Sequence, residues 1–568
     1  MTAALPRNVG DYPGTIPLLL ERAAERDPDG GWLRTDPLCL TFAEAAGLVG
    51  SVAAELRDAG IARGDLVVLT ARNTPPYLLS WLALASIGAV TVPVNPASTP
   101  AELAGLIGQV RPRAVLTDPG IELGPDRAGP DQAGADDAVA RAVIDVNRLG
   151  KEPVGPPLTG PGHAQVRPDD LAVLIPTSGT TGRSKLVMQT HRAYAMAGEG
   201  FPFWMELTAA DRLMTSLPLF HINAPIYSVL GSLACGAGLV LAPRFSASGF
   251  LDTARRHGAT EFNAIGAMLE ILMRQPERPD DADTPLRLCY TGPAPERSRQ
   301  QQIERRFGIR IVVGYALSES PYGLIWPRGT RPFGTLGAVR QHPYLGTVNE
   351  ARVIAEDGSG CAAGQAGELL LRNPVLTPGY WGMPEETAAV LAGGWLRTGD
   401  LVTVNEDGTY TFVGRRKEVL RRRGENLSPL EVQDAIDAHP AVLESAVTGL
   451  ASELSEEEIK AFVVAAPGAV IDFAELREFV AGRLSAFKVP RFWQLLDELP
   501  RTPTARIAKH RLPAGHQPGE YDAGAGQAAR QAADAGQGGN AGQGGDAGQG
   551  GDAGRAGEGS PRPGRSSR

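Results

Sequence analysis

The stretch Thr177-Ser178-Gly179-Thr180-Thr181-Gly182-Arg183-Ser184-Lys185 directly follows the apolar run LAVLIP at 171–176. Such a run is typical of a buried strand. The glycines and hydroxyl residues after it leave backbone N–H groups accessible and add hydroxyl donors. The loop can therefore surround phosphate oxygens, while Lys185 supplies a positive charge. The Gly-Lys-Ser/Thr ending of a Walker loop is absent. On these residues alone, a plain flexible turn remains an alternative.

Strands and helices alternate on both sides of this loop. Between residues 40 and 100, amphipathic or apolar helical patterns alternate with short apolar runs such as DLVVLTA. Beyond the loop, we predict buried strands at 212–218, 238–243, 261–266 and 310–316. The alternation predicts an α/β fold of packed layers. Segment 118–168 is rich in Gly, Pro, Asp and Ala, and we interpret it as a long surface excursion.

The C-terminal part of the chain has a different character. Capping-box patterns at Ser428 and Asp472 start two helices, and apolar strand candidates lie between them. The last 55 residues are dominated by Ala, Gly, Gln and Asp, with little to bury. We therefore predict a large multi-layer α/β domain at 1–414, a smaller mobile α+β domain at 415–513 and a disordered low-complexity tail at 514–568.

Composition narrows the class of protein. The chain has 568 residues and a net charge of -9, which disfavours nucleic acid as a partner. Its four cysteines, at 39, 235, 289 and 361, form no close pair, so a disulfide framework or zinc site is disfavoured. The N-terminus lacks the pattern of a signal peptide, and the apolar runs are too short to span a bilayer. We expect a cytoplasmic protein that binds neither nucleic acid nor membrane, and we leave a homodimer open.

Further motifs follow the loop in a fixed order. They are PLFH (218–221), TGPAP (291–295), GYALSE (314–319), RTGD (397–400), GRRK (414–417), GEN (424–426) and PRTPT (500–504). Together with the loop, this series resembles the acyl-adenylate-forming (AMP-binding) superfamily, in its acyl-CoA ligase branch, over residues 20 to 513. The resemblance implies an ATP-dependent, AMP-forming carboxylic acid–CoA ligase. Its substrates would be a small-molecule acid, ATP with Mg²⁺, and coenzyme A.

The resemblance also implies roles in the nucleotide site. The loop Thr177–Gly182 and Lys185 would bind phosphates, and Glu319 would hold Mg²⁺, a hard cation that prefers oxygen ligands. Asp400 would accept the ribose hydroxyls. Arg415 would lie on the other side of the ribose, and Tyr315 would stack on adenine beside Gly292, Pro293 and Ala294. Ser318 stands where the family usually has Thr. Without the resemblance, Glu319 reads as a solvated loop acid, and Asp400 and Arg415 as charges of a surface hairpin.

The acyl and thiol parts of the site rest on the resemblance as well. His221 would lie near the adenylate carbonyl, although a lone histidine after an apolar segment also reads as a core residue. The acyl pocket would comprise His221, Asn263, Gly266, Leu317 and Tyr322, a mostly uncharged set that suits a small to medium acid or an arylacid. Lys417 would be the hinge between the domains, and Gly424 would line the coenzyme A tunnel.

The chain departs from the family pattern at a catalytic position. Arg506 stands where the family has a lysine that bridges the carboxylate and the α-phosphate, and arginine differs from lysine in length and geometry. Ser184 and Leu186 also replace the usual Pro and Gly around Lys185. Three alternatives therefore stay open: an adenylating enzyme with a non-CoA acceptor (a carrier-protein thiol, an amine or an inorganic nucleophile), an oxidase of the luciferase type, and a catalytically weakened nucleotide- or acyl-binding homologue.

Overall fold

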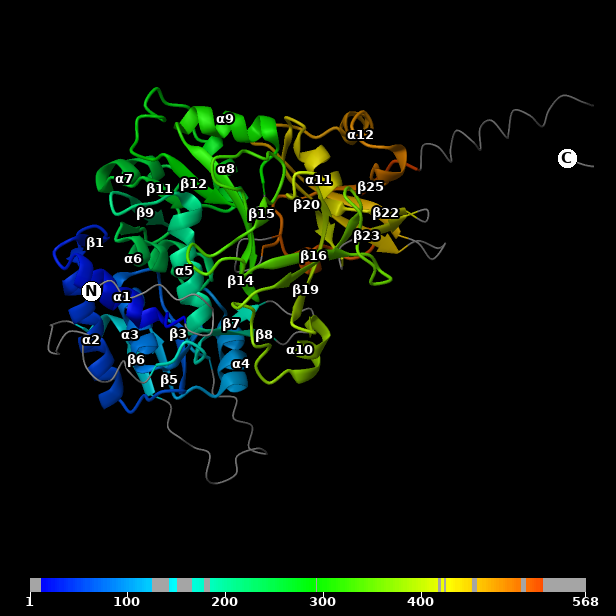
Figure 1. The fold of residues 1–568 in the computed structure, drawn as a ribbon. Coiled ribbons are helices and arrows are strands. Elements are labelled where there is room, and N and C mark those ends of the chain that lie inside the picture. Colours follow the sequence, from blue (N-terminus) through cyan, green and yellow to red (C-terminus); the bar gives the residue numbers. More distant parts are fainter. Residues whose placement is uncertain are drawn as a thin grey trace, which may run out of the picture. The chain divides into compact units, whose positions relative to one another are not determined.

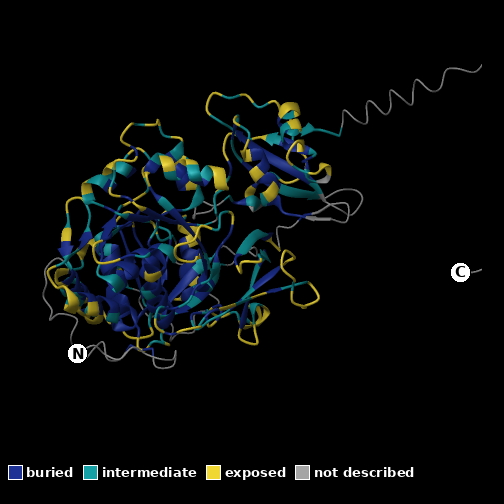
Figure 2. Cartoon of the chain, turned by 45° about the horizontal axis from the view of Figure 1, so that its top comes forward, coloured by how far each residue is buried: buried dark blue, intermediate teal, exposed yellow. Residues whose placement is uncertain are grey.

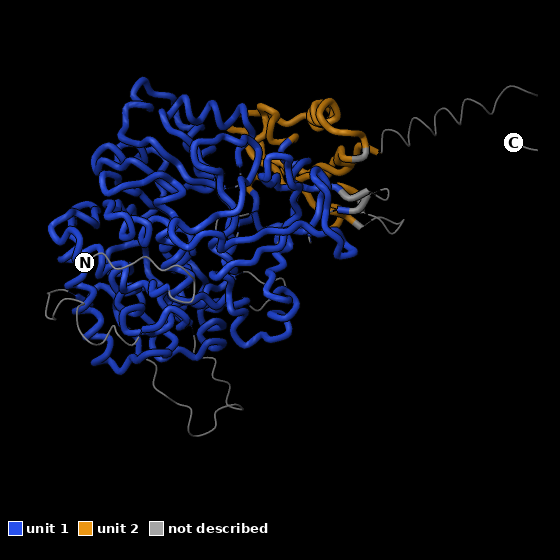
Figure 3. Tube along the Cα trace, viewed as in Figure 1, with its two compact units in different colours: residues 1–434, 499–512 blue, residues 435–498, 513–568 orange. Residues whose placement is uncertain are grey.

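The computed structural model divides the chain into two compact units (Figure 3). Unit 1 comprises residues 1–434 and 499–512, and unit 2 comprises residues 435–498 and 513–568. The structure describes residues 12–124, 142–150, 166–177, 184–292, 294–416, 420–422, 425–451, 457–501 and 507–524. The grouping places 415–434 and 499–512 with the large unit, unlike the predicted division at 415 and 513. That the smaller domain at 415–513 is mobile stays a prediction.

The largest sheet of unit 1 is mainly parallel, with antiparallel strands at both edges (Figure 1). Its order is β15 (Ala338–Val339), β14 (Ser320–Ile325), β13 (Arg310–Leu317), β12 (Leu288–Thr291), β11 (Glu261–Asn263), β9 (Arg212–Thr215), β10 (Gly238–Leu241), β1 (Gly31–Arg34) and β2 (Cys39–Thr41). The predicted strands at 212–218, 238–243, 261–266 and 310–316 are confirmed, although β9 and β11 end earlier than expected.

A second sheet of unit 1 contains the two strands on either side of the phosphate-loop candidate, which end at Thr177 and begin at Lys185. Its order is β6 (Ala142–Asp145), β5 (Ala114–Thr117), β3 (Leu66–Thr70), β4 (Val90–Pro93), β7 (Leu171–Thr177) and β8 (Lys185–Thr190). The strands are parallel except that β8 runs antiparallel to β7. Strand β6 and the short 3₁₀ helix Val146–Arg148 lie within 118–168, so the interpretation of this segment as a long surface excursion was wrong for residues 142–148. A four-residue edge strand carries too little pattern to be recognised.

A third sheet of unit 1 is antiparallel, and one of its strands contains the RTGD motif at 397–400. Strands β16 (Glu350–Ile354), β17 (Ala366–Arg372), β19 (Trp395–Val404) and β18 (Leu391–Ala392) are neighbours in that order, and β20 (Tyr410–Arg415) pairs with β19. A small hairpin of β21 (Leu420–Arg422) and β22 (Glu425–Leu427) follows.

The helices of unit 1 fill the space beside these sheets. They are α1 (Ile16–Arg26), α2 (Phe42–Asp58), α3 (Pro75–Ile87), α4 (Pro100–Val110), α5 (His191–Met205), α6 (Gly231–Cys235), α7 (Phe250–His257), α8 (Gly266–Met273), α9 (Arg297–Phe307), α10 (Pro384–Val390) and the π-helical segment Ala224–Leu230. The boundary between the two units falls within α11 (Pro429–Asp437). Helix α2 begins after the N-cap Thr41, which forms a capping box with Glu44. No helix of the described residues is long and apolar enough to cross a membrane.

One core is shared by the two larger sheets. Residues 77–87 of α3 are all buried, as is most of α5, and both helices belong to a cluster that includes β3, β7, β9 and β12. Figure 2 shows the buried residues concentrated inside each unit. Helix α4 covers the other face of the second sheet through Leu103, Ile107 and their neighbours. Burial of this size, at about 25 cal/mol per Å² of apolar surface, is the main stabilising contribution.

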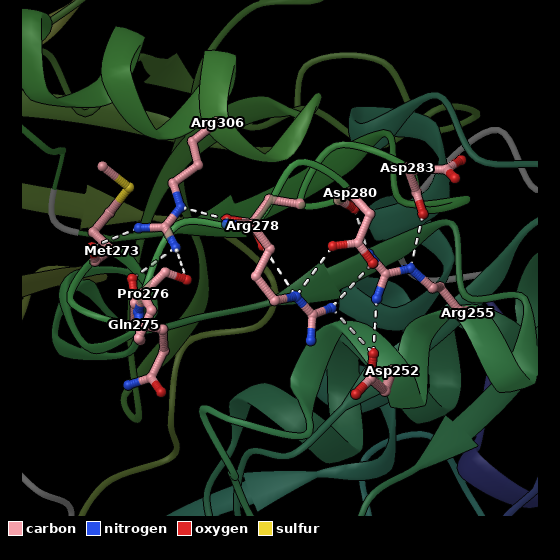
Figure 4. Close-up of polar contacts among 10 residues, drawn as sticks. Asp252, Arg255, Met273, Gln275, Pro276, Arg278, Asp280, Asp283 and Arg306 are labelled. Carbon is pink, nitrogen blue, oxygen red and sulfur yellow. Dashed lines mark hydrogen bonds and ion pairs between the residues drawn. The ribbon is translucent and has the colours of Figure 1, made fainter.

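An arginine network fastens the loop between α8 and β12 (Figure 4). Arg306 on α9 donates to the carbonyl oxygens of Met273 (2.6 Å) and Gln275 (2.8 Å) at the end of α8. Arg255 on α7 donates to the carbonyl oxygen of Asp283 (2.8 Å). The contact to Met273 satisfies a backbone acceptor that the end of α8 leaves open, and the other two bind carbonyl oxygens of the loop itself.

Unit 2 is a small α+β unit, as predicted. Strands β23 (Val442–Ala451), β24 (Glu457–Ala465), β25 (Phe492–Leu495) and β26 (Tyr521–Asp522) form its sheet, and α12 (Phe473–Ala481) begins at the N-cap Asp472. Strand β26 lies beyond residue 513, inside the predicted tail. The predicted tail boundary at 514 was therefore too early, because residues 514–524 belong to the ordered part of this unit.

Candidate nucleotide site

Three residues from separate motifs meet at the end of β13. The Tyr315 hydroxyl donates to Asp400 Oδ2 at 2.6 Å, and Arg415 Nε lies 3.2 Å from Asp400 Oδ1. Asp400 and Arg415 face each other across the β19–β20 pair. Asp400 is only 2% exposed. Burial and the Asp400 carboxylate raise the pKa of Tyr315 well above its usual value, so its hydroxyl stays protonated and acts as the donor.

The backbone beside Tyr315 is packed too closely for side chains. A Cβ on Gly292, just after β12, would lie 2.4 Å from the carbonyl oxygen of Gly314. A Cβ on Gly323 would lie 2.1 Å from the carbonyl oxygen of Tyr315. Glycine is therefore required at both positions. The next predicted residue, Pro293, lies outside the described residues, and Ala294 is half-buried.

The ends of the phosphate-loop candidate are held together by a hairpin. Thr177 at the end of β7 pairs with Lys185 at the start of β8, and the Thr177 hydroxyl donates to the Lys185 carbonyl oxygen at 3.3 Å. Ser178, Gly179, Thr180, Thr181 and Gly182 lie outside the described residues. The ammonium of Lys185 lies 4.6 Å from the centre of the Tyr380 ring.

The turn between β13 and β14 presents Glu319. Gln189 on β8 donates to the carbonyl oxygen of Ser318 at 2.6 Å, and the backbone N–H of Thr377 donates to the carbonyl oxygen of Glu319 at 2.8 Å. The Glu319 carboxylate accepts a hydrogen bond from the Tyr380 hydroxyl at 2.9 Å. Sequence reasoning missed Gln189 and Tyr380. The sequence held one signal for Tyr380, the glycine that precedes it. The φ of 139° at Gly379 disfavours other residues, so this glycine marks a special backbone position.

The residues expected around the acyl group are distributed over several elements. Asn263, at the end of β11, donates through Nδ2 to Asn223 Oδ1 (2.8 Å) and to Ser228 Oγ (3.2 Å). Gly266 starts α8, and the space where its Cβ would lie is open. Sequence reasoning missed Asn223, because only the fold brings this residue next to Asn263.

The remaining predicted pocket residues have different surroundings. The His221 backbone N–H donates to the Pro218 carbonyl oxygen at 3.1 Å, and Leu317 ends β13. Tyr322 is fully buried, with its ring edge-on to Trp204 at 4.9 Å between centroids. Whether His221, Leu317 and Tyr322 touch an acyl group stays a prediction.

The strand ends that precede the predicted hinge are tied to a buried carboxylate. Glu368 on β17 accepts from the Gly399 N–H at 3.2 Å and from Arg416 Nη1 at 3.4 Å, and it pairs with Arg397. Glu368 therefore holds both the segment that carries Asp400 and the residue just before Lys417. Three of the predicted site residues, Lys417, Gly424 and Arg506, lie outside the described residues.

These features define an α/β protein with a candidate nucleotide site at the carboxyl ends of its parallel strands, where open α/β sheets bind ligands. Comparison with known proteins gives the family. Residues 20–381 match the model of the AMP-binding enzyme family, and residues 431–506 match that of the AMP-binding enzyme C-terminal domain. The chain belongs to the AMP-binding enzyme family, which confirms the resemblance seen in the motifs.

Relatives and solved structures agree with this assignment. A crotonobetaine/carnitine–CoA ligase of Salmonella paratyphi C (strain RKS4594) is 31% identical over 466 residues, which are 80% of this chain and 89% of that ligase. ATP-bound MatB from Rhodopseudomonas palustris has a TM-score of 0.74 and 27% identity, covering 88% of this chain and 98% of MatB. The anthranilate CoA ligase AuaEII, in complex with anthranoyl-AMP, has a TM-score of 0.79 and 24% identity, covering 89% and 98%. The predicted fold class is thereby confirmed.

Proposed function

We propose that this chain is an AMP-forming carboxylic acid–CoA ligase that uses ATP. The Tyr315–Asp400–Arg415 cluster carries the proposal, because a buried carboxylate is held ready at the end of β13 beside a glycine-lined backbone. A carboxylate has about four lone-pair sites, and Asp400 would accept ribose hydroxyls beside its contacts with Tyr315 and Arg415. The 31% identical crotonobetaine/carnitine–CoA ligase supports coenzyme A as the acceptor.

Adenylation requires positive charge from the protein or a metal ion beside the phosphates of ATP. Lys185 supplies a positive charge at the end of the phosphate-loop candidate, and Glu319 offers a hard oxygen ligand. The residues present fit Mg²⁺, because Tyr380 engages Glu319 through Oε1 and the remaining lone pairs suit a cation that also binds phosphate oxygens. Bound Mg²⁺ would neutralise phosphate charge. Positioning of the carboxylate in line with the α-phosphorus then provides much of the catalysis.

The second half-reaction is thioester formation. We propose that the thiol of coenzyme A attacks the acyl-adenylate carbonyl after movement of the small domain about Lys417, with Gly424 lining the thiol's path. Arg506 would act in the first half-reaction only. We further propose that the enzyme works in the cytoplasm, and a homodimer stays open. The cysteines are all free thiols, which suits a reducing compartment.

The acid is the least determined substrate. The proposed pocket residues His221, Asn263, Gly266, Leu317 and Tyr322 are mostly uncharged, which favours a small to medium acid or an arylacid. The open space beside Gly266 would accommodate a bulky part of the acyl group at that position.

A screen of pyrophosphate release over a panel of acids, with and without coenzyme A, tests the proposal. We expect AMP and pyrophosphate as products and an acyl-CoA thioester only when coenzyme A is present. Formation of ADP and phosphate would contradict the mechanism. Turnover with a carrier-protein thiol or an amine, but not with coenzyme A, would favour the alternative acceptor.

A further inference from the structure

The segment 377–381 lies along β8 like an additional strand. Met188 N–H donates to the Gly379 carbonyl oxygen at 3.0 Å, and Trp381 N–H donates to the Leu186 carbonyl oxygen at 2.9 Å. Val187 and Tyr380 form the antiparallel bridge between these bonds. The backbone therefore fixes Tyr380 beside the strand that begins at Lys185.

Further contacts hold this segment in place. The Tyr380 N–H donates to Thr387 Oγ1 at 2.9 Å, and a Cβ on Gly379 would lie 2.4 Å from Thr387 Cγ2. The Thr377 N–H binds the Glu319 carbonyl oxygen at 2.8 Å. The same short segment thus touches both β8 and the turn that presents Glu319.

The Tyr380 side chain contacts the two charged groups expected to bind ATP and its metal. Its hydroxyl donates to Glu319 Oε1 at 2.9 Å, and its ring lies 4.6 Å from the Lys185 ammonium. Tyr380 is 6% exposed.

An ammonium and a carboxylate at one site tend to pair with each other, since their attraction grows as water is excluded. Lys185 and Glu319 both belong to the described residues, and they form no ion pair with each other. Each instead contacts a neutral group: the face of the Tyr380 ring attracts the cation, and the hydroxyl binds the anion. Both charges consequently stay available for a ligand.

We propose that Tyr380 is a positioning residue that orients Lys185 and Glu319 for Mg²⁺–ATP and keeps them from pairing with each other. The inference rests on the proposed function of this site. Its two parts can be separated, because the hydroxyl acts on Glu319 and the ring acts on Lys185. Tyr380→Phe removes the first and keeps the second, whereas Tyr380→Leu removes both.

Calorimetric binding of α,β-methylene-ATP, in Mg²⁺ and in EDTA, tests the two parts. For Tyr380→Phe we expect about 3–10-fold weaker binding in Mg²⁺, the effect of one lost hydrogen bond, and unchanged binding in EDTA. For Tyr380→Leu we expect weaker binding under both conditions. Tyr344→Phe is the matched control, because Tyr344 is 49% exposed, and it should bind as wild type. Equal weakening of Tyr380→Phe in Mg²⁺ and EDTA would indicate a merely structural role and overturn the inference.

A second comparison tests whether Tyr380 keeps the charges apart. Glu319→Gln should tighten binding in EDTA more strongly in the Tyr380→Leu background than in wild type, since it frees Lys185 from a direct pair. An equal gain in both backgrounds would overturn that part.

Two single variants separate this inference from the proposed function. If Lys185→Met and Glu319→Gln weaken Mg²⁺-dependent binding but the Tyr380 variants do not, the inference fails and the function stands. If none of these variants alters binding, both fail.

Discussion

Replacing Glu520 with Gln should destabilise unit 2 strongly, although Glu520 lies at the edge of a segment that looks featureless in sequence. Lys460 on β24 is 1% exposed, and its ammonium pairs with the Glu520 carboxylate and donates to the Gly515 carbonyl oxygen at 2.8 Å. His516 Nδ1 lies 2.6 Å from Glu520 Oε1. The pair is therefore buried and hydrogen-bonded, within one unit.

The size of the effect follows from the burial. Side chains of Lys460 and Glu520 are 2% and 6% exposed, so the Glu520→Gln variant leaves a buried ammonium without its counter-charge. Breaking a buried pair in this way costs about 3–5 kcal/mol. In a unit of this size, each 1 kcal/mol shifts the melting temperature by about 4–8 °C, so we expect a shift of roughly 15 °C or more.

Denaturant unfolding of the full chain measures this cost. Lys460→Met alone should cost less than Glu520→Gln, and the Lys460→Met/Glu520→Gln double variant should recover most of the loss, because it buries no unpaired charge. Deleting 525–568 is the matched control and should leave stability unchanged, whereas deleting 513–568 should resemble Glu520→Gln or exceed it. A Glu520→Gln cost below about 1 kcal/mol, or strict additivity in the double variant, would refute the argument.

The remaining predictions concern the site and the core. Asp400→Asn should weaken ATP binding by about 2–4 kcal/mol in calorimetry, through loss of charge-assisted hydrogen bonds, and should lower the melting temperature because Asp400 also holds Tyr315. Unchanged affinity would contradict the ribose role. Burial lowers the pKa of His191 from 6.5 to about 4, so the unfolded chain binds the proton more readily. The free energy of unfolding should fall by about 3 kcal/mol as pH drops from about 6.5 to about 4, and His191→Gln should flatten that slope in urea titrations. Arg506→Ala should slow adenylate formation about a hundredfold or more, while supplied acyl-adenylate still forms thioester in single-turnover assays. Equal loss in both half-reactions would contradict the role of Arg506.

The fold was largely predictable because its signals are local. Apolar runs marked β7, β9, β10 and β13, and the capping-box pattern at Asp472 marked the start of α12. Tyr315, Asp400 and Arg415 were each singled out because they lie in motifs of the family, whereas the contacts among them were not predicted.

What escaped prediction depends on contacts between distant segments. Tyr380 reaches its place only because residues 377–381 pair with β8, nearly two hundred positions earlier in the chain. Lys460 reads as an exposed charge in an otherwise apolar strand, and Glu520 as part of a polar tail, until pairing buries both. Composition describes the average of a segment, whereas one buried partner is enough to order its first residues.

The partners of three acids in unit 1, Glu368, Glu319 and Asp400, suggest how their tasks differ. Glu368 is saturated by Arg397, Arg416 and the Gly399 N–H, so it has little capacity for a ligand and serves the backbone around it. Glu319 and Asp400 each accept a hydrogen bond from a tyrosine hydroxyl, and Asp400 also pairs with Arg415.

A phenol donates to one lone pair of a carboxylate without cancelling its charge, so Glu319 keeps its negative charge for a cation. At neutral pH the raised pKa values of Tyr380 and Tyr315 keep both phenols as donors. Arginine partners alone would orient these acids equally well but would offset the charge that a metal ion needs. Tyrosine is thus the better partner for an acid such as Glu319, which must be fixed in direction and still bind a cation, whereas Asp400, which would meet neutral ribose hydroxyls, has both a tyrosine and an arginine partner.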